Sequence, residues 1–159
     1  MRGIFSVTVE NHSGALSKLA GLFARRGFNI DSLTVGETDD ATVSSMTIVS
    51  NGDKRTLEQI EKQLNKKIEV IKVRRLEEKS CIEREGIIIK VSYTRSNRKE
   101  IMEICEIMRA RIVHMSMSSL IIEFFGKPSQ VCELIEHLRS YGIQEVTRTG
   151  TLAIQKDVK

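Results

Sequence analysis

The sequence predicts an α+β fold built from two βαββαβ units, because one order of strand and helix patterns occurs twice along its 159 residues. A charged stretch at residues 77–85 separates the two halves and contains few apolar residues. The length suits either one domain or two small ones, and the repeated pattern favours two. We therefore expect two ferredoxin-like units, each with its own core.

In the first half, alternating apolar residues predict strands at about residues 4–10, 30–38, 43–50 and 68–76. A helix is expected at 15–26, since its apolar stripe has helical spacing and Gly27 suits the left-handed position after a helix end. A second helix should begin after Asp53, which we interpret as its N-cap. Its buried face is predicted to contain Leu57, Ile60 and Leu64.

The second half repeats this order. Strands are expected at about residues 87–91, 112–116, 120–125 and 143–149. One helix should carry Ile101, Ile104, Cys105 and Met108 on its apolar stripe. The last helix should begin at Pro128, whose fixed φ suits a first helical position, and end at Gly142.

The turn before the first helix is the candidate binding site. The first amides of a helix lack partners within it and carry partial positive charge, so this helix start can hold a carboxylate. Gly14 leaves the backbone accessible, and the side-chain amides of Asn11 and Asn29 can both donate and accept hydrogen bonds. A free amino acid needs both, because its carboxylate accepts hydrogen bonds and its ammonium group donates them. The same residues also suit an ordinary strand-turn-helix in which the asparagines serve turn geometry alone.

Several segments of the chain resemble one known protein family. These segments are 10–17 (ENHSGALS), 21–23 (GLF), 25–30 (RRGFNI), 32–35 (SLTV), 57–64 (LEQIEKQL) and 142–150 (GIQEVTRTG). Together they are similar to the regulatory small subunit of acetolactate (acetohydroxyacid) synthase, and the first is also the ligand turn of amino-acid-sensing ACT domains. Met108 and His114 depart from the family pattern, in which an aromatic and an acidic residue are usual.

The resemblance implies a division into an ACT amino-acid-sensing domain at 1–76, a connector at 77–85 and a C-terminal ferredoxin-like regulatory or docking domain at 86–159. It also implies a homodimer through the ACT domains and a valine site at the interface between the protomers. The expected ligand-binding residues are Asn11, Ser13, Gly14, Ala15, Leu16, Asn29 and Ile30. Ser96, Asn97 and Arg98 stand in place of this turn in the second half and argue against a second identical site.

The resemblance further implies a regulatory subunit that activates a large catalytic subunit and makes it sensitive to valine or another branched-chain amino acid. Thiamine diphosphate, magnesium and FAD would belong to that catalytic subunit, and this chain would hold no cofactor. The residues agree with a chain that has no catalytic site, because the scattered histidines match no metalloprotease, nucleophile-elbow or phosphate-loop motif.

Cysteine spacing and the lengths of the apolar runs limit which kinds of site and which cellular location we expect. Cys81, Cys105 and Cys132 are widely spaced, which predicts neither a disulfide framework nor a zinc site. We expect Cys105 and Cys132 to be small core residues and Cys81 to lie in the charged connector. No apolar run approaches the ~20 residues of a membrane span and no signal-peptide pattern is present, so a cytoplasmic protein is expected.

Two other functions fit the pattern. A free-standing amino-acid sensor with a different target would share the first turn, although it would not be expected to match the family through residues 142–150. A ferredoxin-like nucleic-acid-binding module is the other alternative. The net charge of +4 is small, and the local cationic residues at 66–67 and 72–75 have no aromatic platform beside them.

Overall fold

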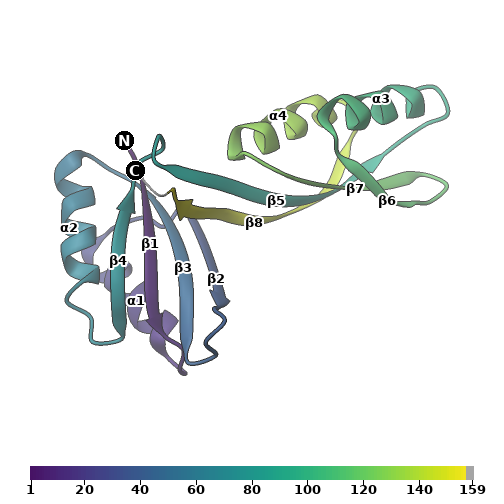
Figure 1. The fold of residues 1–159 in the computed structure, drawn as a ribbon. Coiled ribbons are helices and arrows are strands. Elements are labelled where there is room, and N and C mark those ends of the chain that lie inside the picture. The colour runs from purple at the N-terminus through teal and green to yellow at the C-terminus, as the bar shows by residue number, and fades with distance from the viewer. Residues whose placement is uncertain (157–159) are drawn as a thin grey trace. The chain divides into compact units, whose positions relative to one another are not determined.

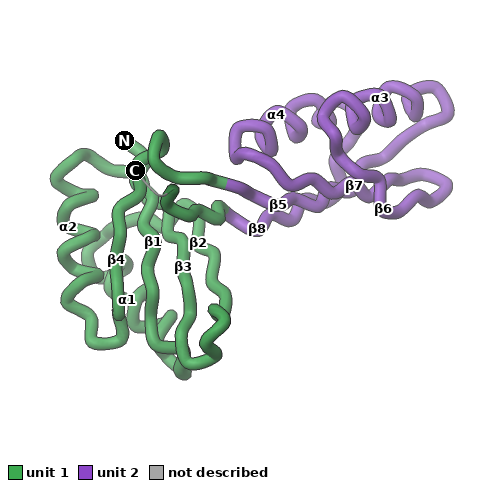
Figure 2. The backbone as a smooth tube through the Cα atoms, viewed as in Figure 1, with its two compact units in different colours: residues 1–83, 151–159 green, residues 84–150 purple. Residues whose placement is uncertain are grey.

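A computed structural model describes residues 1–156 and confirms the predicted α+β class. The chain forms two compact units, each a four-stranded antiparallel sheet with two helices (Figure 1). The first unit comprises Met1–Glu83 together with the segment from Thr151 onward, and the second comprises Arg84–Gly150 (Figure 2). Both units follow the predicted βαββαβ order.

The first unit has the sheet order β2-β3-β1-β4. Its elements are β1 (Arg2–Glu10), α1 (Ala15–Arg26), β2 (Ser32–Glu37), β3 (Val43–Asn51), α2 (Lys54–Leu64) and β4 (Val70–Leu76). The central strands β1 and β3 pair with Phe5 opposite Ile48 and Val7 opposite Met46. Those four side chains are buried against apolar residues of both helices, so α1 and α2 cover the same face of the sheet.

The predicted end of α1 and the predicted start of α2 are confirmed. Gly27 follows α1 with φ 67°, and its amide bonds to the carbonyls of Ala24 and Phe23. The left-handed backbone that closes the helix is one that glycine adopts without strain. At the start of α2, the Asp53 carboxylate accepts a hydrogen bond from the Thr56 amide at 2.7 Å. The Gly27 cap ends α1 before β2, and the Asp53 cap begins α2 shortly after β3.

The second unit has the sheet order β6-β7-β5-β8. Its elements are β5 (Cys81–Ser92), α3 (Arg98–Met108), β6 (Arg111–Met115), β7 (Ser119–Gly126), α4 (Pro128–Arg139) and β8 (Ile143–Gln155). Helices α3 and α4 lie on one face of this sheet (Figure 1), where Ile101 and Leu134 join a core with Ile89 and Ile122. The other face of the sheet carries no helix of this unit.

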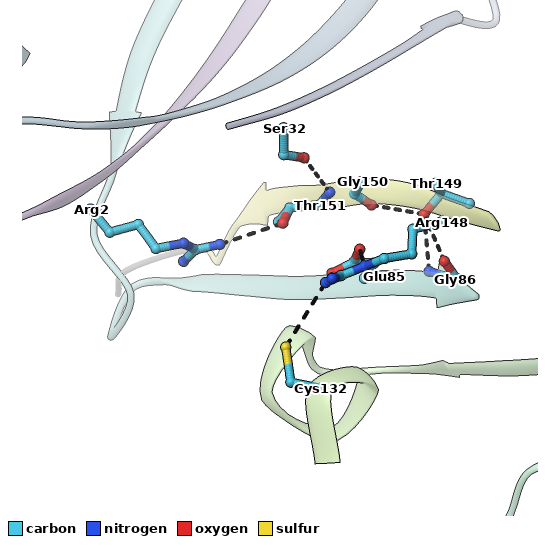
Figure 3. Close-up of polar contacts among 9 residues, drawn as sticks. All are labelled: Arg2, Ser32, Glu85, Gly86, Cys132, Arg148, Thr149, Gly150 and Thr151. Carbon is cyan, nitrogen blue, oxygen red and sulfur yellow. Dashed lines mark hydrogen bonds and ion pairs between the residues drawn. The ribbon is translucent and has the colours of Figure 1, made fainter. Parts of the chain in front are cut away.

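The two longest strands, β5 and β8, differ from the sequence prediction. Residues 81–85, expected in the connector, begin β5, and β8 continues past Thr149 to Gln155. The Thr151 amide donates to Ser32 Oγ at 2.8 Å (Figure 3). The segment from Thr151 thereby packs on the first unit, whereas the sequence division assigned it to the C-terminal domain at 86–159. Residues 157–159 of that predicted domain lie outside the described part of the chain.

Two of the three cysteine expectations need correction. Cys105 is buried in the second core, as expected. Cys132 is exposed on α4, because it lies on the side of the helix opposite the buried Val131 and Leu134. Cys81 is buried in a small cluster with Ile4 and Val49, because the first residues of β5 belong to the first unit. Within residues 1–156 no helix is both long and apolar enough to cross a bilayer.

Candidate functional site

The turn between β1 and α1 has an open backbone at its centre. Gly14 immediately precedes the helix and has φ 89° and ψ −11°, a left-handed conformation that costs an ordinary L residue conformational energy. A Cβ placed on Gly14 would meet no atom within 4 Å. The backbone at the start of α1 is therefore accessible from outside the protein.

The first amides of α1 are available to a ligand because no side chain caps this helix. The Ala15 amide donates to the His12 carbonyl at 3.2 Å, and the helical ladder begins with the Lys18 amide bonded to the Gly14 carbonyl at 3.0 Å. The amides of Leu16 and Ser17 lie between these two donors and have no acceptor within the helix. The Ser13 hydroxyl does not cap the helix.

Asn11 holds the turn against the loop between β2 and β3. Its backbone amide donates to the Thr42 carbonyl at 2.7 Å. Its side-chain nitrogen donates to the Ala41 carbonyl at 2.8 Å and to the Glu37 carboxylate at 3.1 Å. Both amide hydrogens are thus used within the chain, and the side-chain oxygen is the part of Asn11 that can accept from a ligand ammonium group.

Asn29 and Ile30 lie at the opposite end of α1 from this turn. Twelve helical residues separate the two places, a length of about 18 Å. The Asn29 side-chain nitrogen donates to Asp31 at 2.6 Å, and Ile30 packs partly buried against the first core. Within one chain the predicted residues therefore form two groups, one at residues 11–16 and one at residues 29–30.

A polar cluster beside the turn was not foreseen from the sequence. Lys18, on the first turn of α1, forms an ion pair with Glu69, the residue immediately before β4. Glu69 is 9% exposed, and its backbone carbonyl accepts from the Glu10 amide at 2.9 Å. The hydrogen bond from Lys18 lowers the pKa of the Glu69 carboxyl. No local pattern predicts this contact, because the two residues are 51 positions apart in the chain.

Two carboxylates flank the turn, Glu37 on the Asn11 side chain and Glu69 beside Lys18 of α1. The first turn of α1 contains no acidic side chain that would repel a carboxylate. The charge of Glu69 is balanced by Lys18, so the helix dipole and the accessible amides favour a bound carboxylate. Half-exposed Leu16 and Val35 provide apolar surface in the same unit, at 42% and 41% exposure. Among residues 1–156 no group of three or more potential ligating side chains is arranged to hold a metal ion.

Family models match both units of the chain. The model described as an AHAS small subunit-like ACT domain matches residues 5–72. A second, described as the small subunit of acetolactate synthase, matches residues 84–157. The chain belongs to the acetolactate synthase small-subunit family.

Individual members of this family match over the whole chain. The probable acetolactate synthase small subunit of Archaeoglobus fulgidus is 48% identical over 159 residues, covering 100% of this chain and 99% of the relative. The acetolactate synthase small subunit of Haemophilus influenzae is 44% identical over 100% of this chain and 98% of its own. The acetolactate synthase small subunit of Bacillus subtilis is 42% identical, covering 98% of this chain and 91% of its own.

A solved structure of the family has the same fold. The crystal structure of the small subunit from Thermotoga maritima is 38% identical, with a TM-score of 0.93 over 100% of this chain and 99% of that one. The first unit is accordingly an ACT domain, as the sequence predicted. The turn at residues 11–14 opens the first helix of this ACT domain.

Proposed function

We propose that this chain is the regulatory subunit of acetolactate synthase, which activates the catalytic subunit and makes it subject to feedback inhibition by valine. The observation that carries this proposal is the uncapped start of α1 behind Gly14, where backbone amides are accessible to a small carboxylate. Family membership over the full chain supports a function tied to this synthase rather than to an unrelated target.

Valine fits the chemistry of the turn. Its carboxylate would accept from the Leu16 and Ser17 amides, and its ammonium group would donate to the Asn11 side-chain oxygen. Leu16 and Val35 would contact the aliphatic side chain. One methylene in an apolar pocket changes binding by only about 1 to 3 kcal/mol, so leucine and isoleucine should also bind, with different affinities.

The remaining predicted ligand residues would come from a second copy of the chain. Asn29 and Ile30 lie about 18 Å from the turn along α1, too far to contact the same amino acid within one protomer. A symmetric pair of ACT domains with adjacent α1 helices would bring the partner subunit's Asn29 towards the turn. We infer a homodimer in which each valine is bound between two protomers.

Valine would act by shifting a population of conformations. A ligand shifts an equilibrium only by the difference in its affinity for the two states, so valine must bind the inhibited arrangement more tightly than the active one. A coupling free energy of about 1 to 3 kcal/mol would change activity roughly 5- to 150-fold. We assign sensing to the first unit and contact with the catalytic subunit or signal transmission to the second.

Catalysis would belong to the large subunit, which would hold thiamine diphosphate, magnesium and FAD. The present chain would contribute binding surface and valine sensitivity but no reacting group. In this assignment the small subunit is a cytoplasmic component of branched-chain amino acid biosynthesis.

Reconstitution with the large subunit tests the proposal. Addition of the full chain should raise acetolactate formation, and valine should then lower it in a saturable manner, while the large subunit alone should be less active and insensitive to valine. A chain that binds valine but neither binds nor activates the large subunit would instead be a free-standing sensor. Salt-dependent binding of RNA or DNA, without valine sensitivity, would support the nucleic-acid-binding alternative.

A further inference from the structure

The second unit contains a groove on the sheet face that α3 and α4 leave open. Its volume is about 650 Å³, within the usual range for small-molecule sites. The lining residues that carry the argument are Gly86, Ile88, Arg109, Arg111, Glu123 and Phe125. The groove lies wholly within residues 84–150 and is separate from the turn at residues 11–14.

Two exposed apolar side chains form the floor of the groove. Ile88 is opposite Glu123 in the pairing of β5 with β7, so Phe125, two residues further along β7, is its diagonal neighbour on the same face. Their exposures of 51% and 60% are high for large apolar residues on a sheet. Such a surface favours the apolar body of a ligand.

Gly86 leaves space between this floor and β8. A Cβ at this position would lie 3.1 Å from Thr149 Cγ2 and 3.5 Å from Phe125 Cδ2. The Gly86 amide donates to Thr149 Oγ1 at 3.0 Å and fixes the two strands at this point (Figure 3). Glycine therefore keeps the groove open where a side chain would fill it.

The charged side chains that line the groove determine which kind of anion it can bind. Arg111 donates from Nε to the Glu123 carboxylate at 2.7 Å, so those two charges balance. Arg109 takes part in none of the ion pairs formed within residues 1–156, which leaves its planar guanidinium available to a carboxylate. Arg148 also lines the groove, but its guanidinium is bound to the Glu85 carboxylate, so Arg109 is the cation of this lining that has no acidic partner in the described chain. A single negative charge fits this arrangement best.

We propose that this groove binds a small organic monocarboxylate with an apolar body. The carboxylate pairs with Arg109, and the apolar body lies on Ile88 and Phe125. This site is independent of the valine proposal, because it shares no residue with the turn at residues 11–14 and requires no catalytic subunit.

Phenylacetate is a suitable probe, and ¹H–¹⁵N spectra of the full-length chain can follow its binding. We expect saturable shifts of the Gly86, Ile88 and Arg109 amides with affinity of about millimolar, as befits a fragment of this size. The uncharged phenylacetamide and the dianion phenyl phosphate should each bind more weakly. Shifts of the same amides with equal affinity for phenylacetate and phenylacetamide would overturn the role of charge.

Three variants separate the groove from general charge effects. Arg109→Gln should weaken phenylacetate binding roughly tenfold or more, because a charged hydrogen bond is lost. Phe125→Ala should also weaken it by removing apolar contact. Arg139→Gln on α4 removes the same charge from an exposed ion pair of the same unit and should bind as the wild type does. Wild-type affinity in Arg109→Gln would contradict the proposal.

A contact between protein copies is the competing use of this face. If Phe125→Asp lowers the mass of the assembly in analytical ultracentrifugation while phenylacetate fails to shift the groove amides of the wild type, the face is a subunit interface and the proposal is wrong. An unchanged mass together with loss of the phenylacetate shifts in this variant is the expected result.

Discussion

Lys18 on the first turn of α1 donates a hydrogen bond to the buried carboxylate of Glu69, the residue immediately before β4. The pair ties the beginning of the candidate valine-binding helix to a strand on the edge of the sheet. It also neutralises a negative charge that would otherwise oppose a carboxylate at the helix start. Glu69 thus affects both the stability of the turn and the electrostatics of the proposed site.

The first prediction concerns the pH dependence of stability at Glu69. Lys18 lowers the folded-state pKa of Glu69 below its ordinary value of 4.5, so the unfolded chain binds more protons than the folded chain as the solution is acidified. The stabilisation should be complete above pH 4.5 and should be lost as the pH falls through the lower, folded-state pKa. Urea unfolding of the wild type and Glu69→Gln should show a smaller loss of stability with acid in the variant.

Glu136→Gln is the control for that comparison. Glu136 forms an exposed pair with Arg139 on α4, far along the chain from the turn. This variant should retain the acid dependence of the wild type. If Glu69→Gln also retains it in full, the Lys18 contact does not set the titration of Glu69.

The second prediction tests the backbone at Gly14. In Gly14→Asp a carboxylate would occupy the place expected for that of the ligand, and valine inhibition of the reconstituted synthase should be lost while activation persists. The open space at this position accommodates a side chain, and Gly14→Asn is the matched control because asparagine tolerates left-handed backbone and carries no charge. The asparagine variant should keep more valine sensitivity than the aspartate variant. Equal, wild-type inhibition in both would remove Gly14 from the site.

The third prediction concerns Asn29. Asn29→Ala should weaken valine binding in calorimetry with little change in folding, because the side chain is exposed and makes one hydrogen bond, to Asp31. Asn51→Ala provides a close control, since the Asn51 side chain donates to the other oxygen of Asp31 at 3.0 Å. The Asn51 variant should bind valine normally. Matching losses in the two variants would assign the effect to Asp31 rather than to contact with the ligand.

The fourth prediction concerns the ion pair that links β5 to β8. Arg148 binds Glu85 through two hydrogen bonds of 2.7 and 3.0 Å, and the Glu85 side chain is 4% exposed (Figure 3). Arg148→Met should reduce the free energy of unfolding by about 1 to 3 kcal/mol, because it leaves a buried carboxylate unpaired. Arg111→Met breaks an exposed pair and should cost below about 1 kcal/mol. Urea unfolding compares the two, and equal losses would contradict the role assigned to burial.

The helices of the first unit could be predicted from the sequence because local signals define them. The apolar stripe and Gly27 gave the bounds of α1, and Asp53 gave the start of α2. The lengths of β5 and β8 could not be predicted in the same way. The charged residues at 77–85 made the start of β5 look like a connecting segment, although Glu85 pairs with Arg148 of β8 across 63 positions.

The candidate site was predictable in part. The turn motif and the glycine before α1 can be recognised locally, and the structure places the accessible amides behind Gly14. The contact between Lys18 and Glu69 depends on tertiary structure and has no local signal. The same is true of the hydrogen bonds that direct the Asn11 side chain to Ala41 and Glu37.

Valine titration of the isotopically labelled full-length chain, followed through its backbone amides, tests the central proposal most directly. Saturable shifts of the Leu16 and Ser17 amides at the concentrations that inhibit the reconstituted synthase are the predicted result. Valine inhibition that persists while these two resonances stay unmoved would contradict the account.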